Sequence, residues 1–278
     1  PHLMVEQMKD LGLFGATISQ KYGGIGLPSS TYAKVVATIS EVWMSLTGIF
    51  NSHLIMAAAV ERFGTEAQRN YYLPKFVTGE LRGGLALTEP DCGTDLQAIR
   101  TRAVKHGRDY VINGTKTWIS NGIEGNCVAL LAKTDIEVEP RHKGMSLFLA
   151  EKSDGFNVGK KLKKLGYKGI DSAELMFDDY HISQDNLIGG EEGHGFLQTM
   201  GGLELGRINV AARGVGVANA ALKDATSYAQ TRSTMGKPIG QHQAIQTKLG
   251  DMATRSHAAR LLVEDAANAY DRGDRCDM

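Results

Sequence analysis

The spacing of apolar residues changes twice along this chain of 278 residues, and the change limits the folds open to it. Residues 1–82 show a helical repeat, residues 83–190 show short strand-like runs, and residues 191–278 return to the helical repeat. Helices and strands present one face with periods of 3.6 and 2 residues, so one pattern cannot serve both. We therefore expect an α+β multidomain protein: an N-terminal helical domain, a middle β-barrel or sandwich domain, and a C-terminal helical bundle.

Helix start and stop signals are specific in the first part. Pro28-Ser29-Ser30 precedes an apolar stripe and gives a start signal. Gly64 ends one helix, and Thr65 with Gln68 forms a capping box that opens the next, because each side chain can bond the other residue's backbone N–H. The stripe on one helical face consists of Tyr32, Val35, Val36, Ile39, Val42 and Trp43.

Turn and strand signals fill the middle part. Asn113-Gly114 lies between β-branched and aromatic runs, which predicts a hairpin with a type I′ turn at this dipeptide. A second turn is expected at 106–109, and short apolar runs at 127–131 and 145–149 predict buried strands. Several strands at this spacing favour a small barrel or sandwich.

Two long helical stretches make up the third part, from Phe196 to Gln230 and from about Ile245 to Tyr270. Helices well above the average length of about 11 residues need broad partner surfaces, which favours a bundle. Gly214-Val215-Gly216 resembles the start of a dinucleotide-binding GxGxxG, but the third glycine is missing and no strand precedes it. Close packing between helices is the better interpretation of these glycines.

Composition and missing motifs exclude several classes of protein. Lys plus Arg and Asp plus Glu both number 31, and this balance argues against a nucleic-acid-binding protein. The sequence contains no run of about 18 apolar residues, so we expect no membrane span. Cys92, Cys127 and Cys276 lack the spacing of a metal site, so we expect reduced thiols and no metal. Motifs of P-loop enzymes, HExxH metalloenzymes and GxSxG hydrolases do not occur.

Six segments in a fixed order carry a more specific signal. They are Tyr22-Gly23-Gly24-Ile25-Gly26, Phe63-Gly64-Thr65-Glu66, Thr88-Glu89-Pro90, Trp118-Ile119-Ser120-Asn121-Gly122, Phe177-Asp178-Asp179, and Arg232 to Ile239 followed by His242-Gln243. Together they resemble the acyl-CoA dehydrogenase family of flavoproteins over essentially the whole chain. The resemblance implies FAD bound between the β domain and a four-helix bundle. It also implies a homotetramer built as a dimer of dimers, in a bacterial cytoplasm or a mitochondrial matrix.

The activity implied by this resemblance is α,β-dehydrogenation of an acyl-CoA thioester to the trans-2-enoyl-CoA. A carboxylate base would take the α-proton while a hydride passes to the flavin, and the electrons would go on to an electron-transfer flavoprotein. Two alternatives stay open: a flavin oxidase or monooxygenase of the same fold, and a non-catalytic acyl-CoA dehydrogenase-like binding protein. The sequence does not reveal the length or branching of the acyl chain.

The resemblance also implies a set of cofactor-binding residues. Thr88 and the backbone around Leu85 and Leu87 would bond the pyrimidine edge of the flavin. Gly93 and Thr94 would approach the pyrophosphate, where glycine lets the backbone come close. The full set is Leu85, Leu87, Thr88, Gly93, Thr94, Trp118, Ser120, Arg232, Met235, His242 and Gln243.

The remaining members of this set have roles of their own. Trp118 would lie against the flavin ring, and the Ser120 hydroxyl would reach N5. Arg232 would meet the FAD phosphate from the adjacent subunit, since a guanidinium suits phosphate. Met235 departs from the family pattern, in which a phenylalanine is typical, and could fill the space without ring stacking.

For the substrate, the resemblance implies that Thr94, Glu204 and Arg207 line the acyl-CoA channel. The alternative for Glu204 and Arg207 is a surface ion pair at i, i+3. The catalytic base is unknown: Gly206 occupies one of the two positions that the family uses, and Glu204 lies about 200° away around the helix. We expect the base to lie C-terminal to Met278, with only the first two bundle helices present and the first N-terminal helix partly missing.

Overall fold

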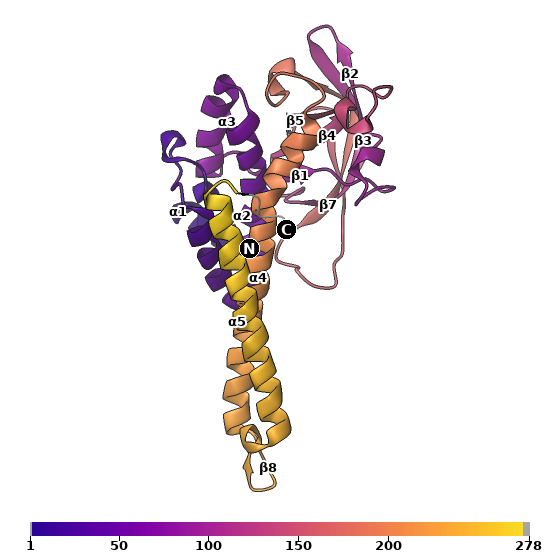
Figure 1. Ribbon diagram of the computed structural model, residues 1–278. Helices are drawn as coiled ribbons and strands as arrows, with labels where there is room; N and C mark the ends of the chain where they lie inside the picture. The colour runs from indigo at the N-terminus through magenta and orange to yellow at the C-terminus, as the bar shows by residue number, and fades with distance from the viewer. Residues whose placement is uncertain (1, 275–278) are drawn as a thin grey trace. The chain divides into compact units, whose positions relative to one another are not determined.

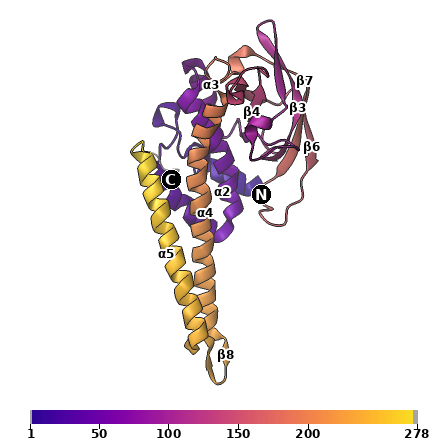
Figure 2. The same ribbon diagram turned by 45° about the vertical axis from the view of Figure 1, so that its right-hand side comes forward.

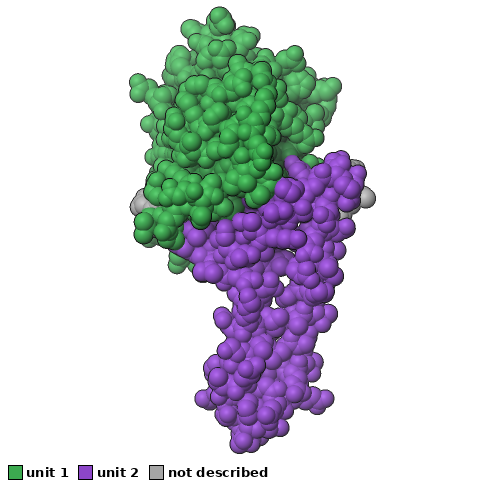
Figure 3. All heavy atoms as spheres, turned by 90° about the vertical axis from the view of Figure 1, so that its left-hand side faces the viewer, with its two compact units in different colours: residues 1–27, 48–206 green, residues 28–47, 207–278 purple. Residues whose placement is uncertain are grey.

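The computed structural model describes residues 2–274 and has the order of elements that the sequence predicts (Figure 1). Helices come first, strands follow, and two long helices complete the chain, so the predicted fold class is confirmed. Contacts between residues divide the chain into two compact units, residues 1–27 with 48–206 and residues 28–47 with 207–278 (Figure 3). The predicted domain boundaries after residues 82 and 190 remain a prediction.

The helical part begins as the sequence indicates. It contains α1 (His2–Asp10), η1 (Leu13–Gly15), η2 (Gln20–Tyr22), α2 (Ser29–Phe63) and α3 (Glu66–Thr78). Helix α2 starts at Ser29, within the predicted start signal, but Trp43 interrupts it with φ −155° and ψ 92°. Tyr32 and Val36 are fully buried, whereas Val42 is 90% exposed. The predicted apolar stripe is therefore wrong at Val42, which directly precedes the kink at Trp43.

The capping box at the start of α3 is confirmed. Thr65 Oγ1 accepts the Gln68 N–H at 3.2 Å, and Gln68 Oε1 accepts the Thr65 N–H at 3.0 Å. Gln68 Nε2 also donates to the carbonyls of Asp185 and Leu187, at 2.8 and 2.7 Å. This buried amide consequently joins α3 to the segment that follows the last strand of the sheet.

Seven of the described strands form one sheet in the order β1-β4-β2-β3-β7-β6, with β5 paired to β4. Strand β1 runs parallel to β4, and the hairpins pair antiparallel. Apolar residues from β4 and β5 are buried along their whole length, as the two apolar runs predict. The strands and short helices of this part are β1 (Gly83–Ala86), η3 (Leu96–Ala98), β2 (Arg102–His106), β3 (Asp109–Ser120), β4 (Cys127–Lys133), η4 (Arg141–Gly144), β5 (Met145–Glu151), β6 (Phe156–Lys161), β7 (Ser172–Ile182) and η5 (Gln184–Asn186).

The predicted hairpin at Asn113-Gly114 is wrong, because this dipeptide lies inside the continuous strand β3. Asn113 exchanges hydrogen bonds with Asp179 across an irregularity in the pairing with β7, at 3.0 and 2.9 Å. A Cβ at Gly114 would approach the Thr101 Cα to 2.7 Å, so glycine is needed here for close packing. The other predicted turn is confirmed, since His106 pairs with Asp109 across a two-residue loop.

The expectations for the cysteines and for membrane spans can be compared with the structure. Cys92 is a half-buried free thiol and Cys127 a buried one, while Cys276 lies outside the described residues. Burial raises the pKa of the Cys127 thiol. Within residues 2–274, α2 is the one helix whose length and composition would suffice to cross a membrane, and 67% of its most apolar window is buried. Such burial is typical of a core helix, so this finding is weak evidence for a span.

The second unit consists of the N-terminal part of α2, the C-terminal part of α4 (Gly195–Thr231), and α5 (Gln243–Asp271). Strands β8 (Ser233–Thr234) and β9 (Lys237–Pro238) with η6 (Ile239–Gln241) connect the last two helices. Figures 1 and 2 both show α5 beside this part of α4.

Close packing inside this second unit explains one of the glycines. A Cβ at Gly216 of α4 would collide with the Ala37 carbonyl of α2, which confirms the predicted close helix packing at this glycine. The same prediction is wrong for Gly214, because no atom lies within 4 Å of a Cβ built there. Asn209 of α4 also donates to the Tyr32 hydroxyl of α2 at 2.7 Å.

Candidate functional site

Strand β1 and the loop that follows it hold five of the predicted cofactor-binding residues. Leu85 is half-buried within β1, Leu87 is buried, and Thr88 is half-buried. The next residues make a tight turn, in which Glu89 and Cys92 exchange backbone hydrogen bonds of 2.9 and 3.1 Å. The turn reverses the chain and leaves the following residues, Gly93 and Thr94, exposed.

Open space and free polar groups characterise this loop. A Cβ at Gly93 would meet only the Thr88 Cγ2 atom, at 3.8 Å. Within the part of the chain that the structure describes, the hydroxyls and backbone N–H groups of Thr88 and Thr94 have no protein hydrogen-bond partner. The loop therefore presents hydrogen-bond donors and acceptors beside Gly93, where no side chain occupies the adjacent space.

Strand β3 carries the two remaining predicted cofactor-binding residues of this unit, Trp118 and Ser120. Trp118 is 55% exposed and has a φ of 60°, which is uncommon for a bulky residue. It lies where the pairing of β3 with β7 shifts register, between Lys116 and Ile119. A β-bulge of this kind redirects a side chain, and here it turns the indole outward. Ser120 follows as the half-buried last residue of β3.

Three hydrogen bonds hold the β1 loop against this bulge. The Thr117 N–H donates to the Thr88 carbonyl at 2.9 Å. Lys116 Nζ donates to the Leu87 carbonyl at 2.9 Å and to Glu89 Oε1 at 2.8 Å. Through these bonds the structure connects the backbone segments that carry the predicted flavin contacts of the first unit.

The ion pair below the loop is buried, with side-chain exposures of 0% for Lys116 and 6% for Glu89. Burial lowers the pKa of Lys116 to about 8, and the nearby Glu89 carboxylate offsets part of this shift. Burial alone would raise the pKa of Glu89, but the Lys116 ammonium and the backbone N–H groups of Arg100 and Thr101 hold it below its ordinary value. The carboxylate therefore stays ionised near neutral pH.

The predicted cofactor residues of the second unit form a separate group around the β8–β9 hairpin. Met235 is 95% exposed at the tip of the hairpin, with a φ of 53°. His242 occupies the N-cap position of α5 without a side-chain capping bond, and its Nε2 lies 3.1 Å from the Thr234 Oγ1. Arg232 is exposed before β8 and Gln243 is the exposed first residue of α5. The structure gathers these four predicted residues on one short connection.

Helix α4 carries the residues predicted to meet substrate or to supply the base. Glu204 Oε2 lies 3.7 Å from Arg62 Nη1, so its ion pair is with α2 and not with the exposed Arg207. Gly206 is buried, and a Cβ there would lie 3.0 Å from the Ile55 Cγ1 and even closer to its Cδ1. The alternative base position is consequently filled by the Ile55 side chain.

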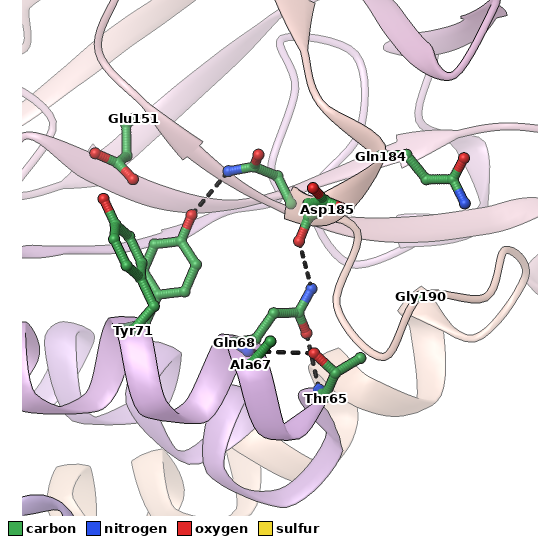
Figure 4. Close-up of a pocket in the computed structure, with 10 residues that line it drawn as sticks. Thr65, Ala67, Gln68, Tyr71, Glu151, Gln184, Asp185 and Gly190 are labelled. Carbon is green, nitrogen blue, oxygen red and sulfur yellow. Dashed lines mark hydrogen bonds between the residues drawn. The ribbon is translucent and has the colours of Figure 1, made fainter.

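A pocket of about 520 Å³ lies elsewhere in the first unit, between α3 and the residues around η5 (Figure 4). Its wall is fixed by hydrogen bonds, among them one of 2.8 Å from Asn186 Nδ2 to the Tyr72 hydroxyl. No predicted site residue lines it. Nowhere in residues 2–274 do three His, Cys, Asp or Glu side chains come together as metal ligands would.

Comparison with known proteins identifies the family. The model of the acyl-CoA dehydrogenase N-terminal domain matches residues 1–80, the middle-domain model matches 84–180, and the C-terminal-domain model matches 193–278. The chain belongs to the acyl-CoA dehydrogenase family. It is 39% identical over 278 residues to an acyl-CoA dehydrogenase of Bacillus subtilis (strain 168), covering 99% of this chain and 73% of that protein.

Other acyl-CoA dehydrogenases show the same likeness. The chain is 37% identical over 287 residues to (2S)-methylsuccinyl-CoA dehydrogenase of Cereibacter sphaeroides, covering 100% of this chain and 52% of the relative. The structure of butyryl-CoA dehydrogenase from Megasphaera elsdenii superimposes with a TM-score of 0.94 at 34% identity, covering 99% of this chain and 73% of that one. The chain thus spans between about half and three quarters of the length of these acyl-CoA dehydrogenases.

The sequence analysis of this member of the acyl-CoA dehydrogenase family missed Glu89 and Lys116 as members of the site. A signal was present, because strand alternation places Lys116 on the same face of β3 as the buried Ile112. A lysine on an inward face needs a buried partner. That partner, Glu89, lies inside the Thr88-Glu89-Pro90 segment that the family resemblance had already singled out.

Proposed function

We propose that this chain forms the flavin-binding and part of the substrate-binding site of an FAD-dependent acyl-CoA dehydrogenase, which converts an acyl-CoA thioester to the trans-2-enoyl-CoA. The observation that supports this most is the half-buried Thr88 together with the exposed Gly93, Thr94 and Trp118, in a member of this family. An electron-transfer flavoprotein is the proposed acceptor, and a dimer of dimers the proposed assembly. A bacterial cytoplasm or a mitochondrial matrix suits this activity.

The residues present fit FAD. Free hydroxyl and N–H groups at Thr88 and Thr94 can bond a flavin edge and a pyrophosphate, and the absence of a side chain at Gly93 leaves room between them. The exposed indole of Trp118 offers a flat apolar surface to an isoalloxazine ring. When bound, FAD supplies acceptance of a hydride equivalent from the β-carbon of the substrate.

The protein's part in this proposal is binding and orientation. Leu85, Leu87 and Thr88 would hold the pyrimidine edge of the flavin, although the Leu87 carbonyl already accepts the Lys116 ammonium. Ser120 would bond the central ring. Hydrogen bonds aimed at an edge that gains negative charge stabilise the charged state, because they are oriented before the reaction begins.

The second unit contributes a separate proposed set. Arg232, with Met235, His242 and Gln243, would bind FAD held by a neighbouring subunit. The exposed guanidinium and the hairpin tip are suited to a partner surface, since both project from the connection between α4 and α5. In this proposal a homo-oligomer completes each cofactor site.

The proposed base is not among the α4 residues. Glu204 is tied to Arg62, and Gly206 has no side chain and no room for one without movement of Ile55. We therefore keep the proposal that a carboxylate outside residues 1–278 takes the α-proton. Thr94, Glu204 and Arg207 would instead position the acyl-CoA.

The test uses the FAD-loaded chain mixed anaerobically with a saturated acyl-CoA, while flavin absorbance and enoyl-CoA are recorded. We expect slow bleaching that added acetate accelerates, because a free carboxylate can replace a missing base. Rapid bleaching without acetate would contradict the proposed position of the base. Bound flavin that never bleaches, even with acetate, would contradict dehydrogenation and favour the non-catalytic alternative. Rapid reoxidation of the reduced flavin by oxygen, with formation of peroxide, would favour the oxidase.

A further inference from the structure

The buried Lys116–Glu89 pair is hydrogen-bonded to the backbone in and around the β1 loop. Glu89 Oε1 accepts the Lys116 ammonium at 2.8 Å and the Thr101 N–H at 3.0 Å, while Oε2 accepts the Arg100 N–H at 2.6 Å. Lys116 Nζ in turn donates to the Leu87 carbonyl at 2.9 Å. One carboxylate and one ammonium therefore join three segments: the β1 loop, the two residues before β2, and β3 at the residue that precedes its bulge.

We propose that Lys116 and Glu89 are positioning residues for the flavin site, fixing the β1 loop to the β3 bulge so that Thr88 and Trp118 meet one cofactor. The inference rests on the proposed function, because it concerns how FAD is held. Neither side chain touches the exterior, so both act through the backbone that they hold. The bulge that contains Trp118 begins directly after Lys116, which ties the direction of the indole to the same pair.

The chemistry of a buried ion pair supports a positioning role. Packing alone would be served as well by apolar side chains, since desolvating two charges offsets most of their attraction. A charged pair instead imposes direction, because each ammonium hydrogen and each carboxylate oxygen requires an aligned partner. Removing one member leaves the other buried and uncompensated, so single substitutions disturb the loop more than replacement of both members.

The same loop contains a matched control. Arg100 and Asp91 form an ion pair of 3.0 Å, but their side chains are 79% and 70% exposed. An exposed pair contributes little, since water screens both charges. Asp91→Asn therefore removes a charge from the same turn without leaving a buried group unpaired.

The experiment compares the wild-type chain with Glu89→Gln, Lys116→Met, the double variant and Asp91→Asn. FAD dissociation constants, the visible spectrum of the bound flavin, and hydrogen exchange of the Arg100, Thr101 and Thr117 amides are measured. We expect each single variant to bind FAD about tenfold or more weakly, with an altered flavin spectrum and faster exchange of these amides. The double variant should recover part of the loss, and Asp91→Asn should stay within about twofold of wild type.

The outcomes separate this inference from the proposed function. A wild-type chain that does not bind FAD contradicts the proposed function, and this inference with it. Wild-type FAD binding with unchanged affinity, spectrum and amide exchange in both single variants contradicts the positioning role alone. If a single variant does not fold, the double variant decides: weaker FAD binding with an altered spectrum supports the role, and wild-type binding and spectrum overturn it.

Discussion

Ile55 and Gly206 occupy the same small space, so that a Cβ at residue 206 would lie 3.0 Å from the Ile55 Cγ1 and closer still to its Cδ1. Ile55 is buried, which limits how far it can move. Gly206→Ala should therefore destabilise the chain by about 1 kcal/mol, because overpacking of about 1–3 kcal/mol exceeds the gain from replacing a helical glycine. Urea denaturation measures the difference.

The control for this variant is Gly214→Ala in the same helix. No atom lies within 4 Å of a Cβ built at Gly214. This substitution should stabilise the chain by about 0.5–1 kcal/mol, since alanine loses less conformational entropy in a helix. Equal stabilisation by both variants would show that Ile55 leaves room at residue 206, and would reopen that position to a catalytic side chain.

The amide of Gln68 should be one of the most costly polar groups to remove. It makes four hydrogen bonds, to Thr65, Asp185, Leu187 and Gly189, between 2.7 and 3.1 Å. Gln68→Ala should lower the free energy of unfolding by about 4 kcal/mol, at roughly 1 kcal/mol for each of the four bonds. Thr65→Ala, which removes only the helix cap, should cost about 1 kcal/mol. Similar losses from both variants in a denaturant titration would contradict the bridging role of Gln68.

The titration of Lys116 provides a test of its burial. Its pKa is lowered to about 8 in the folded chain, whereas an unfolded lysine titrates near about 10.4. The charged pair with Glu89 is therefore complete below pH of about 8 and is lost as the pH rises past this value. Between these two pKa values the native state binds fewer protons than the unfolded state, so the contribution of Lys116 to stability increases with pH. The ¹³Cε shift of Lys116, assigned through Lys116→Arg, should show a midpoint near 8, and a midpoint near 10.4 would contradict the buried environment.

The Glu204 side chain should affect the binding of acyl-CoA and not the binding of FAD. Its ion pair with Arg62 is partly exposed at 3.7 Å, so Glu204→Gln should change stability by less than about 1 kcal/mol. We expect acyl-CoA to bind the FAD-loaded variant about two- to fivefold more weakly, with an unchanged dissociation constant for FAD. Titration of both ligands checks this. Weaker FAD binding with normal acyl-CoA affinity would place Glu204 at the cofactor instead.

Local signals predicted much of the fold because the forces behind them act over a few residues. The capping box at Thr65 and the turn after His106 were confirmed for this reason. The Asn113-Gly114 hairpin was wrong because its competitors lie far away in sequence. Asp179 bonds the Asn113 amide, and Thr101 packs against Gly114, so tertiary contacts override the turn preference.

The site was predictable to a different extent. Thr88, Gly93 and Trp118 were predicted from the resemblance to a family. The structure adds that the Thr88 hydroxyl and N–H have no protein partner among the described residues, that no atom crowds Gly93, and that Trp118 is exposed. The partnership of Lys116 with Glu89 could not be derived from spacing, since the loop, the turn and the bulge must all form before the two charges meet. The crowding of Gly206 by Ile55 likewise depends on packing between α2 and α4.

The central claim is that FAD binds along the Thr88–Thr94 loop, and Gly93→Val tests it most directly. A Cβ at residue 93 meets no protein atom closer than 3.8 Å, and residue 93 is exposed, so we expect the variant to fold with stability close to that of the wild type. Fluorescence titration with FAD should show saturable binding to the wild-type chain and about a hundredfold weaker binding to Gly93→Val, because two branched methyl groups would fill the space left for the cofactor. Equal FAD affinity in the two proteins, at equal stability, would contradict the claim.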